Sequence, residues 1–376
     1  MTPAATGKRI ADFGRGFARG LVFAAALIGI LLTADIACAQ GPAPQNPSPS
    51  ASTAGAAISA QASLLDAGTH FLDRFSTRSW RSLNGGSFPG SNPQGSGGPD
   101  PQTIDRYRAW AEGYGLSSRT SQQGEFTGDT RKTYGGVAGF AYTVAPGATL
   151  GFSVDQSRTD ADVSSLTQSS RIDLTQVGMF TTLESGAWGL SVAGVYGFGD
   201  IHSSRLDGSS FAEASYGVWM VGLLAEVSYQ WTIGNSRIVP KLGFDYVQTN
   251  TDSFVEGGGA APVRGLAQKS ERTRAFAGAE FGHTFILDRG LFDLAFTGKV
   301  IDNLSQTGGN VQVSSTTAVA APRLVQGARE GVWGFDATAV ASWVFAPGWR
   351  LYALYDGRFH DGFTSNGGTA GLEVKW

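Results

Sequence analysis

The stretch that decides the fold is "VWMVGLLAEVSYQW", residues 218–231. Its odd positions, from Trp219 to Trp231, are apolar throughout, whereas the even positions include Gly222 and Glu226. Successive side chains of a β-strand point to opposite faces, so this segment predicts a long strand with one apolar and one polar face. Aromatic residues stand at both ends of the apolar face. The medium that this face meets decides the class of protein.

The same pattern recurs in "GVWGFDATAVASWVF", residues 331–345, where Trp333 and Trp343 share one face and Asp336 lies on the other. A membrane β-barrel carries such an apolar band outside, about 25 Å tall and bounded by aromatic girdles, around a polar interior. A soluble β-sandwich also alternates, but its strands average about 5–6 residues. Because these segments are far longer and carry charges in mid-strand, they favour a transmembrane barrel with a wet lumen.

Similar segments follow one another from residue 104 to the C-terminus. They lie near residues 105–117, 132–144, 148–158, 171–183, 187–199, 217–231, 236–249, 271–285, 290–301, 331–345, 348–359 and 366–376. Tight joints such as "APGA" and "TIGN" alternate with long polar loops, and bacterial barrels place short turns in the periplasm and long loops outside. The sequence therefore predicts an all-β membrane protein, a 12-stranded antiparallel transmembrane β-barrel over residues 104–376. The start of its first strand and the end of its last strand are both expected on the periplasmic side.

The first 39 residues have the features of a secretory signal peptide. A basic segment containing Lys8 and Arg9 precedes the apolar run "LVFAAALIGILLTA", and Ala37 and Ala39 form an A-x-A site, so we expect cleavage after Ala39. The apolar run is too short for a comfortable membrane-spanning helix. A signal peptide implies export from the cytoplasm.

Composition narrows the possible partners and sites. The formal net charge is −3 and removal of the basic leader makes it more negative, which argues against a nucleic-acid partner. The single cysteine, Cys38, lies at the cleavage site, so the mature chain is expected to hold neither a disulfide nor a thiolate metal site. Gly accounts for 53 of 376 residues, about twice the usual share, which suits many turns and strands.

Three segments precede the barrel. Residues 40–60 are Pro, Ala and Ser without charge, which predicts a flexible exposed tail. Residues 61–82 repeat apolar side chains at helical spacing and predict one amphipathic helix. Residues 83–103 are a linker rich in Gly, Pro and Ser.

From residue 107 to residue 376 the chain resembles the C-terminal translocator β-domain of the autotransporter, or type V secretion, family. The resemblance rests on the opening strand "YRAWAEGYG", the segment "TYGGVAGFAYTVAPGATLGFSVDQS", the central "FVEGGGAAPVRG" and the terminal alternation that ends in an aromatic. The helix before the barrel stands where that family has a helix threading the lumen. The resemblance thus implies an outer-membrane barrel of a Gram-negative bacterium that holds this helix and delivers an upstream passenger to the cell surface.

If the helix is a plug, charges on it can pair with charges on the polar face of the strands. The helix and wall candidates are Asp66, Asp73, Arg74, Arg78, Arg272, Arg274 and Glu280. Further charged residues at the alternate strand positions expected to face the lumen are Arg106, Arg108, Glu112, Lys241, Asp245, Asp336, Arg350 and Asp356. Each of these can equally be a solvated lumen charge or pair from wall to wall.

The closing strand "GTAGLEVKW" places Leu372, Val374 and Trp376 on its lipid face. It resembles the terminal signal by which the outer-membrane barrel assembly machinery recognises its clients. The closing strand must also pair with the first strand, because a free edge in hydrocarbon leaves its backbone unsatisfied.

Two features differ from the family pattern. About twenty residues separate the cleavage site from the helix, where the family carries a large passenger, and no repeats are visible. The helix also lacks the Asn-Asn pair at which some members cut themselves, so we expect no self-cleavage. The sequence therefore predicts a barrel that exposes a very short N-terminal segment or its own loops.

Neither a G-x-S-x-G elbow nor a phosphate loop is present, and we expect no enzyme activity and no cofactor. His202 and His360, each beside an acid at the expected outer rim, leave a rim-located hydrolase as a remote alternative. The pattern of the barrel is also compatible with a passive pore, or with a structural or adhesive surface protein. The partners expected are outer-membrane lipid and the assembly machinery, and the protein is expected to be a monomer.

Overall fold

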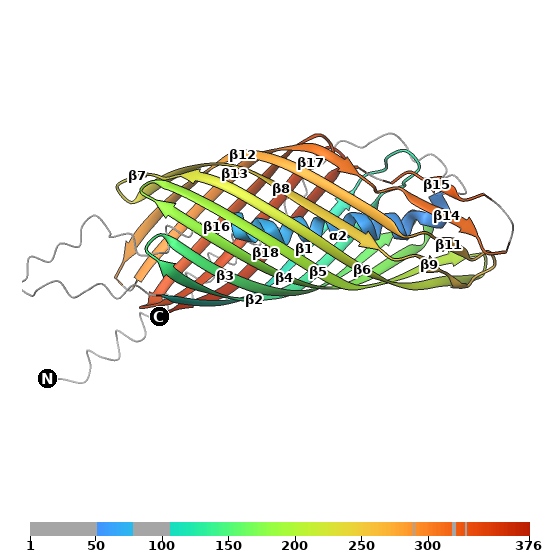
Figure 1. Cartoon of the computed structure of the whole chain (residues 1–376), viewed down its shortest axis with the longest axis horizontal. Helices are drawn as coiled ribbons and strands as arrows, with labels where there is room; N and C mark the ends of the chain where they lie inside the picture. The colour runs from blue at the N-terminus through green and yellow to red at the C-terminus, as the bar shows by residue number, and fades with distance from the viewer. Residues whose placement is uncertain (1–50, 78–105, 289, 318–320, 328) are drawn as a thin grey trace, which may run out of the picture. The chain divides into compact units, whose positions relative to one another are not determined.

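The structure is a computed structural model that describes residues 51–77, 106–288, 290–317, 321–327 and 329–376. In this part of the chain, 12 antiparallel strands form a closed barrel around helix α2, Ala51–Thr77 (Figure 1). The barrel strands are β1 Tyr107–Thr120, β2 Asp129–Ala145, β3 Ala148–Val163, β4 Gln168–Ser185, β5 Trp188–Asp207, β6 Ser210–Tyr229, β8 Ser236–Thr251, β12 Gln268–Leu287, β13 Gly290–Thr307, β16 Trp333–Ala346, β17 Trp349–His360 and β18 Phe363–Lys375. The predicted fold class is confirmed.

The first and last strands close the barrel. Strand β1 pairs with β18 along its whole length, and Ala111 stands opposite Leu372. The Tyr107 N–H donates to the carbonyl oxygen of Trp376 at 2.9 Å, and the Trp376 N–H donates to Tyr107 at 3.0 Å. On the other side β6 pairs with β8, so each barrel strand has two neighbours. The backbone is therefore satisfied within the sheet, as hydrocarbon requires.

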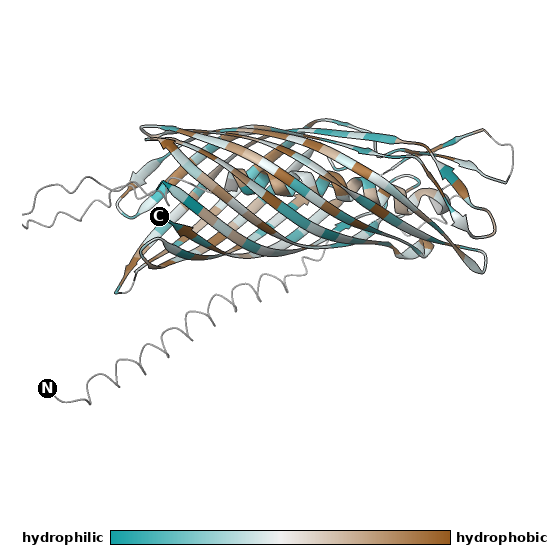
Figure 2. Cartoon of the chain, turned by 60° about the horizontal axis from the view of Figure 1, so that its bottom comes forward, coloured by the Kyte–Doolittle hydropathy of each residue, from teal (hydrophilic) through white to brown (hydrophobic). Residues whose placement is uncertain are grey.

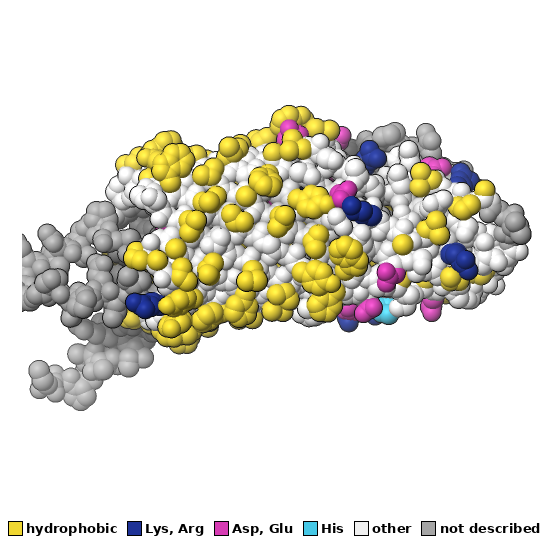
Figure 3. All heavy atoms as spheres, viewed as in Figure 1, with side chains coloured by type: hydrophobic (Ala, Val, Ile, Leu, Met, Phe, Trp, Pro, Cys, Tyr) yellow, Lys and Arg dark blue, Asp and Glu magenta, His cyan; other side chains and the backbone are white. Residues whose placement is uncertain are grey.

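Alternation along the strands separates a lipid face from a lumen face. In β6, Trp219 and Leu223 point outward and are exposed, whereas Met220 and Glu226 point inward and are buried. Hydrophobic and hydrophilic residues alternate along the strand ribbons in Figure 2. Figure 3 shows hydrophobic side chains spread over the barrel body, with charged side chains gathered toward the end that carries the short strands. The apolar body of the barrel is therefore suited to lipid.

Several strands extend further than the sequence predicted. Strands β5 and β6 continue to a two-residue turn at Gly208, and β17 and β18 meet in a two-residue turn at Gly362. Both glycines have a positive φ, 67° and 74°, which suits the tight hairpin. The prediction of long loops at these two joints is thus wrong. Beyond the lipid the pattern changes sides, because Ile201 and Tyr216 are buried inside while His202 and Glu213 are exposed outside, so the apolar outer face that marks the spanning part does not continue.

Helix α2 begins earlier than predicted. Residues 51–60, expected to be part of a flexible tail, form its first turns, and Ile58 and Ala60 are fully buried. Ala, Ser and Gly show no amphipathic period, which hid this part of the helix, although Ala is the best helix former. The leader with its cleavage site, residues 40–50, Arg78, the rest of the helix expected to residue 82, and the linker 83–103 lie outside the described residues. In the described chain no helix has the length and apolar character needed to cross a membrane.

A small sheet lies at the mouth of the barrel where α2 begins (Figure 1). It has the order β15-β14-β11-β9. Its strands are β9 Phe254–Val255, β11 Val263–Gly265, β14 Val311–Ser315 and β15 Arg323–Val325. Three short elements lie outside this sheet: β10 Gly257–Gly258, which pairs with β6, β7 Trp231–Ile233, which follows β6 and pairs with β8, and the 3-10 helix η1 Ser164–Leu166, which joins β3 to β4. One face of the sheet is apolar and buried, and Phe254 stacks on Tyr216 of β6 at a centroid distance of 4.7 Å. We call this sheet the mouth sheet.

Candidate functional site

The candidate site is the lumen around α2. The helix is 27 residues long, or about 40 Å at 1.5 Å per residue, which exceeds the apolar band of a barrel. It begins at the mouth sheet and runs toward the end at which β1 begins and β18 ends (Figure 1). Its apolar and charged side chains lie on two different faces, and each face meets a different part of the wall.

The apolar face packs against the strands from β3 to β8. Phe75 lies against Phe180 of β4 with a centroid distance of 5.1 Å, and Phe71 packs on Phe75. Leu64 and Leu72 are fully buried. Since burial of such a side chain contributes about 1.5–3 kcal/mol, these contacts are sufficient to hold the helix on one side of the lumen.

Glycines allow the helix and the wall to approach closely. A Cβ atom on Gly68 of α2 would lie 2.1 Å from Met220 Cε and 2.9 Å from Val247 Cγ1. On the wall, a Cβ on Gly222 would lie 3.0 Å from Leu72. A larger side chain at Gly68 would therefore push α2 away from β6 and β8.

Asp66 anchors the charged face near the mouth. Its carboxylate pairs with Arg131 of β2 and lies 3.4 Å from Arg272 of β12. Arg272 also donates to Thr69 Oγ1 at 2.6 Å and to the Leu65 carbonyl oxygen at 3.2 Å. Arg272 therefore binds the helix through its backbone as well as through its charge.

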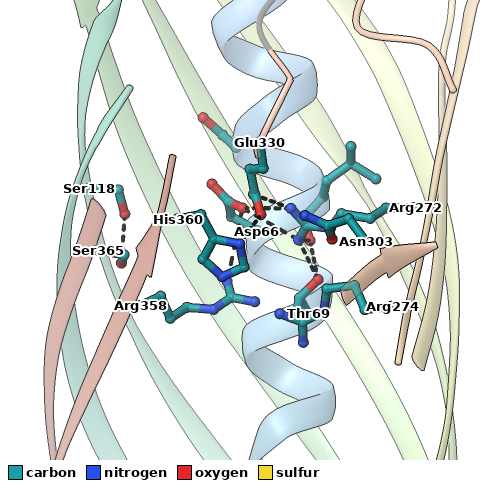
Figure 4. Close-up of polar contacts among 12 residues, drawn as sticks. Asp66, Thr69, Ser118, Arg272, Arg274, Asn303, Glu330, Arg358, His360 and Ser365 are labelled. Carbon is teal, nitrogen blue, oxygen red and sulfur yellow. Dashed lines mark hydrogen bonds and ion pairs between the residues drawn. The ribbon is translucent and has the colours of Figure 1, made fainter. Parts of the chain in front are cut away.

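Glu330 completes this layer from outside the barrel strands (Figure 4). It lies between β15 and β16, pairs with Arg272, and lies 3.6 Å from His360 Nδ1. His360 Nε2 in turn lies 3.2 Å from Asp336. Burial alone would raise the pKa of Glu330, but Arg272, His360 and Arg358 outweigh it and lower this pKa from 4.5 to about 2. Glu330 is thus held as a carboxylate.

Asp73 lies two turns further from the mouth and meets a second group of cations. It is 3.4 Å from Arg274 and 3.8 Å from both Lys299 and Arg358. Arg274 is fully buried and also pairs with Asp245 at 2.8 Å. Buried charges are tolerated where they are paired in this way.

The last turn of α2 is also tied to the wall. Arg74 pairs with Glu112 of β1 and its guanidinium lies 4.2 Å from the centre of the Tyr114 ring. Ser76 donates to Glu226, and Lys299 Nζ donates to Ser76 Oγ at 2.6 Å. Polar contacts therefore run along the charged face from one end of the helix to the other.

Other residues singled out in the sequence have different surroundings. Glu280 pairs with Arg237 at 2.9 Å and with Lys241 at 3.1 Å, so its ion pairs connect wall to wall and not wall to helix. Arg106 precedes β1 and is exposed. The terminal Trp376 points outward and stacks on Tyr107 at a centroid distance of 5.9 Å. Leu372 is also on the outer face, and Val374 is partly buried on the same face.

The two rim histidines do not share a site. His202 of β5 is exposed on the outer face, whereas the His360 side chain is buried in the lumen. Within the described residues the ion-pair partners of His360 are Asp336 and Glu330, not the neighbouring Asp361 as a rim hydrolase required. In the part of the chain that the structure describes, no cluster of three or more His, Cys, Asp or Glu side chains is suited to a metal ion.

Sequence reasoning missed four residues that shape the site. Arg131 lies just outside the predicted second strand, and Arg358 shares the parity of Asp356 two positions before it, so strand periodicity could have identified both. Thr69 lies on the predicted helix, but helical spacing does not report a hydrogen-bond partner for a hydroxyl. Glu330 lies in a connection, and its position depends on the tertiary structure alone. The site as a whole surrounds a helix, and the charges next to Asp66, Asp73 and Arg74 contact that helix.

Known proteins resemble parts of this chain. A family model described as "Autotransporter beta-domain" matches residues 109–356. An extracellular serine protease of Serratia marcescens is 26% identical over 179 residues, which are 46% of this chain but only 17% of the protease. The translocator domain of the autotransporter NalP from Neisseria meningitidis is 17% identical, with a TM-score of 0.65 over 84% of this chain and 98% of that domain. The β-domain of the Bordetella autotransporter BrkA is 14% identical, with a TM-score of 0.53 over 72% of this chain and all of that domain (100%).

Proposed function

Because the chain belongs to the autotransporter β-domain family, whose members are outer-membrane proteins of Gram-negative bacteria, we propose that it is a translocator unit that exposes the segment ahead of α2 at the cell surface. The direction of α2 carries the proposal. The helix begins at the mouth sheet, opposite the end where Tyr107 and Trp376 meet. The short turns between strands indicate that the end with Tyr107 and Trp376 faces the periplasm. The residues before α2 then leave the barrel on the outside.

The lumen contacts support retention of the helix after transport. Buried ion pairs and hydrogen bonds involve α2 from Ser59, which donates to Asp129, to Ser76 near its end. A passive pore requires an open lumen, whereas α2 occupies the lumen here. In this proposal α2 is the membrane anchor of whatever precedes it in the chain. The protease activity named for the Serratia relative is not proposed for this chain.

Lipid and the assembly machinery are the partners that the proposal requires. The apolar outer face suits lipid on all sides, which agrees with a monomer. The outward face of β18, with Leu372, Val374 and Trp376, is the proposed assembly signal. It lies at the β1–β18 closure, so a client would present this strand before the barrel closes.

An epitope test on intact cells decides the proposed direction. An epitope inserted near Pro47 is expected to bind antibody without permeabilisation. A matched control carries the same epitope at Gly186, in the turn between β4 and β5, and is expected to bind only after permeabilisation. The opposite pattern, with Gly186 reached on intact cells and Pro47 not, would contradict the proposal.

A further inference from the structure

The connection between β13 and β16 holds Glu330 firmly in place. The Arg329 N–H donates to Gln123 Oε1 of the β1–β2 connection at 2.9 Å. On the other side of Glu330, Asn303 Nδ2 of β13 donates to the Gly331 carbonyl oxygen at 2.6 Å. The backbone on both sides of Glu330 is therefore tied to other parts of the mouth, which fixes the direction of its side chain.

That side chain points into the lumen beside α2 (Figure 4). Its exposed fraction is only 9%, and it contacts Arg272 and His360. Arg272 reaches α2 through Thr69, and His360 reaches Asp336 of β16. Glu330 thus joins the helix to the wall formed by β16 and β17.

This is the side on which α2 leaves space. The helix packs closely on the strands from β3 to β8, whereas a cavity of about 60 Å³ lies beside it on the side of β13, β16, β17 and β18. His70, Asp73, Arg350 and Asp356 are among the residues that line this cavity. A cavity of this size and polarity has room for several waters. Asp66, near which Glu330 lies in Figure 4, precedes His70 of the cavity by four residues, or about one turn of α2, toward the mouth.

We propose that Glu330 is a second closure of the lumen, which blocks the passage of ions between α2 and the β16–β17 side of the barrel. The helix fills one side of the lumen, and Glu330 with Arg272 and His360 fills the other. Loss of the carboxylate removes one negative charge beside Arg272 and Arg358, while Asp66 stays next to both, so the charge balance of the opened passage shifts toward anions. The proposal concerns closure alone and holds whichever segment the barrel displays.

Conductance of the full-length protein in planar bilayers tests the proposal. Wild type is compared with Glu330→Ala, which removes the side chain, with Glu330→Gln, which removes only the charge, and with a deletion of residues 51–77. Glu271→Ala is the matched control, because Glu271 is an acid on β12 that pairs with Lys269 on the exposed outer side. Heat-dependent mobility on gels first verifies that each variant is a folded barrel.

We expect Glu330→Ala to conduct several-fold more than wild type and to shift the reversal potential toward anion selectivity. Glu330→Gln should lie between the two, and Glu271→Ala should match wild type. If the helix deletion raises the current while Glu330→Ala and Glu330→Gln do not, the second closure is refuted and α2 remains the plug. If Glu330→Ala raises the current above wild type and deletion of residues 51–77 does not, the closure by Glu330 is supported and the helix plug is refuted.

Discussion

Replacing Arg272 by alanine tests whether the helix is held by buried polar contacts. Arg272 is 1% exposed and touches Asp66, Thr69, the Leu65 carbonyl oxygen and Glu330. Removing one partner of a buried ion pair costs about 3–5 kcal/mol. In the variant Asp66 still pairs with Arg131, and Glu330 still pairs with His360. We therefore expect the free energy of unfolding to fall by about 3 kcal/mol, the lower limit of that range.

Arg171→Ala is the matched control. Arg171 is also a strand arginine in an ion pair, 3.1 Å from Asp160, but its side chain is 57% exposed on the outer face. Exposed pairs contribute about 0–1 kcal/mol, so this variant should unfold almost as wild type does. Arg272→Lys keeps the charge but not the forked donor, and should recover part of the loss.

Guanidinium unfolding in lipid vesicles, followed by tryptophan fluorescence, measures these differences. For cooperative unfolding of helix and barrel together, the slope against denaturant should be the same for all three variants. If Arg272→Ala and Arg171→Ala lose the same stability within about 1 kcal/mol, the lumen contacts do not hold the helix as described.

Three single-residue changes test other parts of the structure. Trp376→Lys should lower the amount of assembled barrel in the outer membrane, measured by heat-dependent gel mobility. The fraction that assembles should unfold as wild type does. Normal surface levels would contradict the proposed assembly signal. Gly68→Leu should displace α2 from Met220 and Val247 and cost about 1–3 kcal/mol, whereas Ala67→Leu, at a partly buried neighbour, should cost less. The pKa of Glu330 is lower in the folded protein than in the unfolded chain, so its stabilising contribution is present above about pH 4.5 and is lost as the pH falls toward 2; wild type should therefore lose more stability over that range than Glu330→Gln.

The barrel was largely predictable because lipid imposes a strict pattern. Trp219 and Leu223 must face hydrocarbon and Glu226 must not, so alternation in the sequence reports strand, face and register together. The joints at Gly208 and Gly362 were not predicted as tight turns. There the strands leave the lipid, and the outer face turns polar while Ile201 and Tyr216 stay buried inside, so the apolar outer face no longer marks the strand.

The lumen was predictable only in part. Alternation along the strand placed Arg272 and Arg274 inside, and the sequence named Asp66 and Asp73 as candidate charges of the helix, but neither observation selects partners across the lumen. Pairing depends on where α2 sits and on its approach at Gly68. Glu330 is set by the folding of a connection, which sequence periodicity does not report.

Hydrogen exchange of the assembled barrel in lipid vesicles tests most directly whether α2 is bound in the lumen. Peptides covering residues 55–75 should exchange as slowly as those from β4 and β6, because the helix opens only when the lumen contacts break. Exchange of these peptides within seconds, as for an isolated helix in water, while the strands stay protected, would contradict the account.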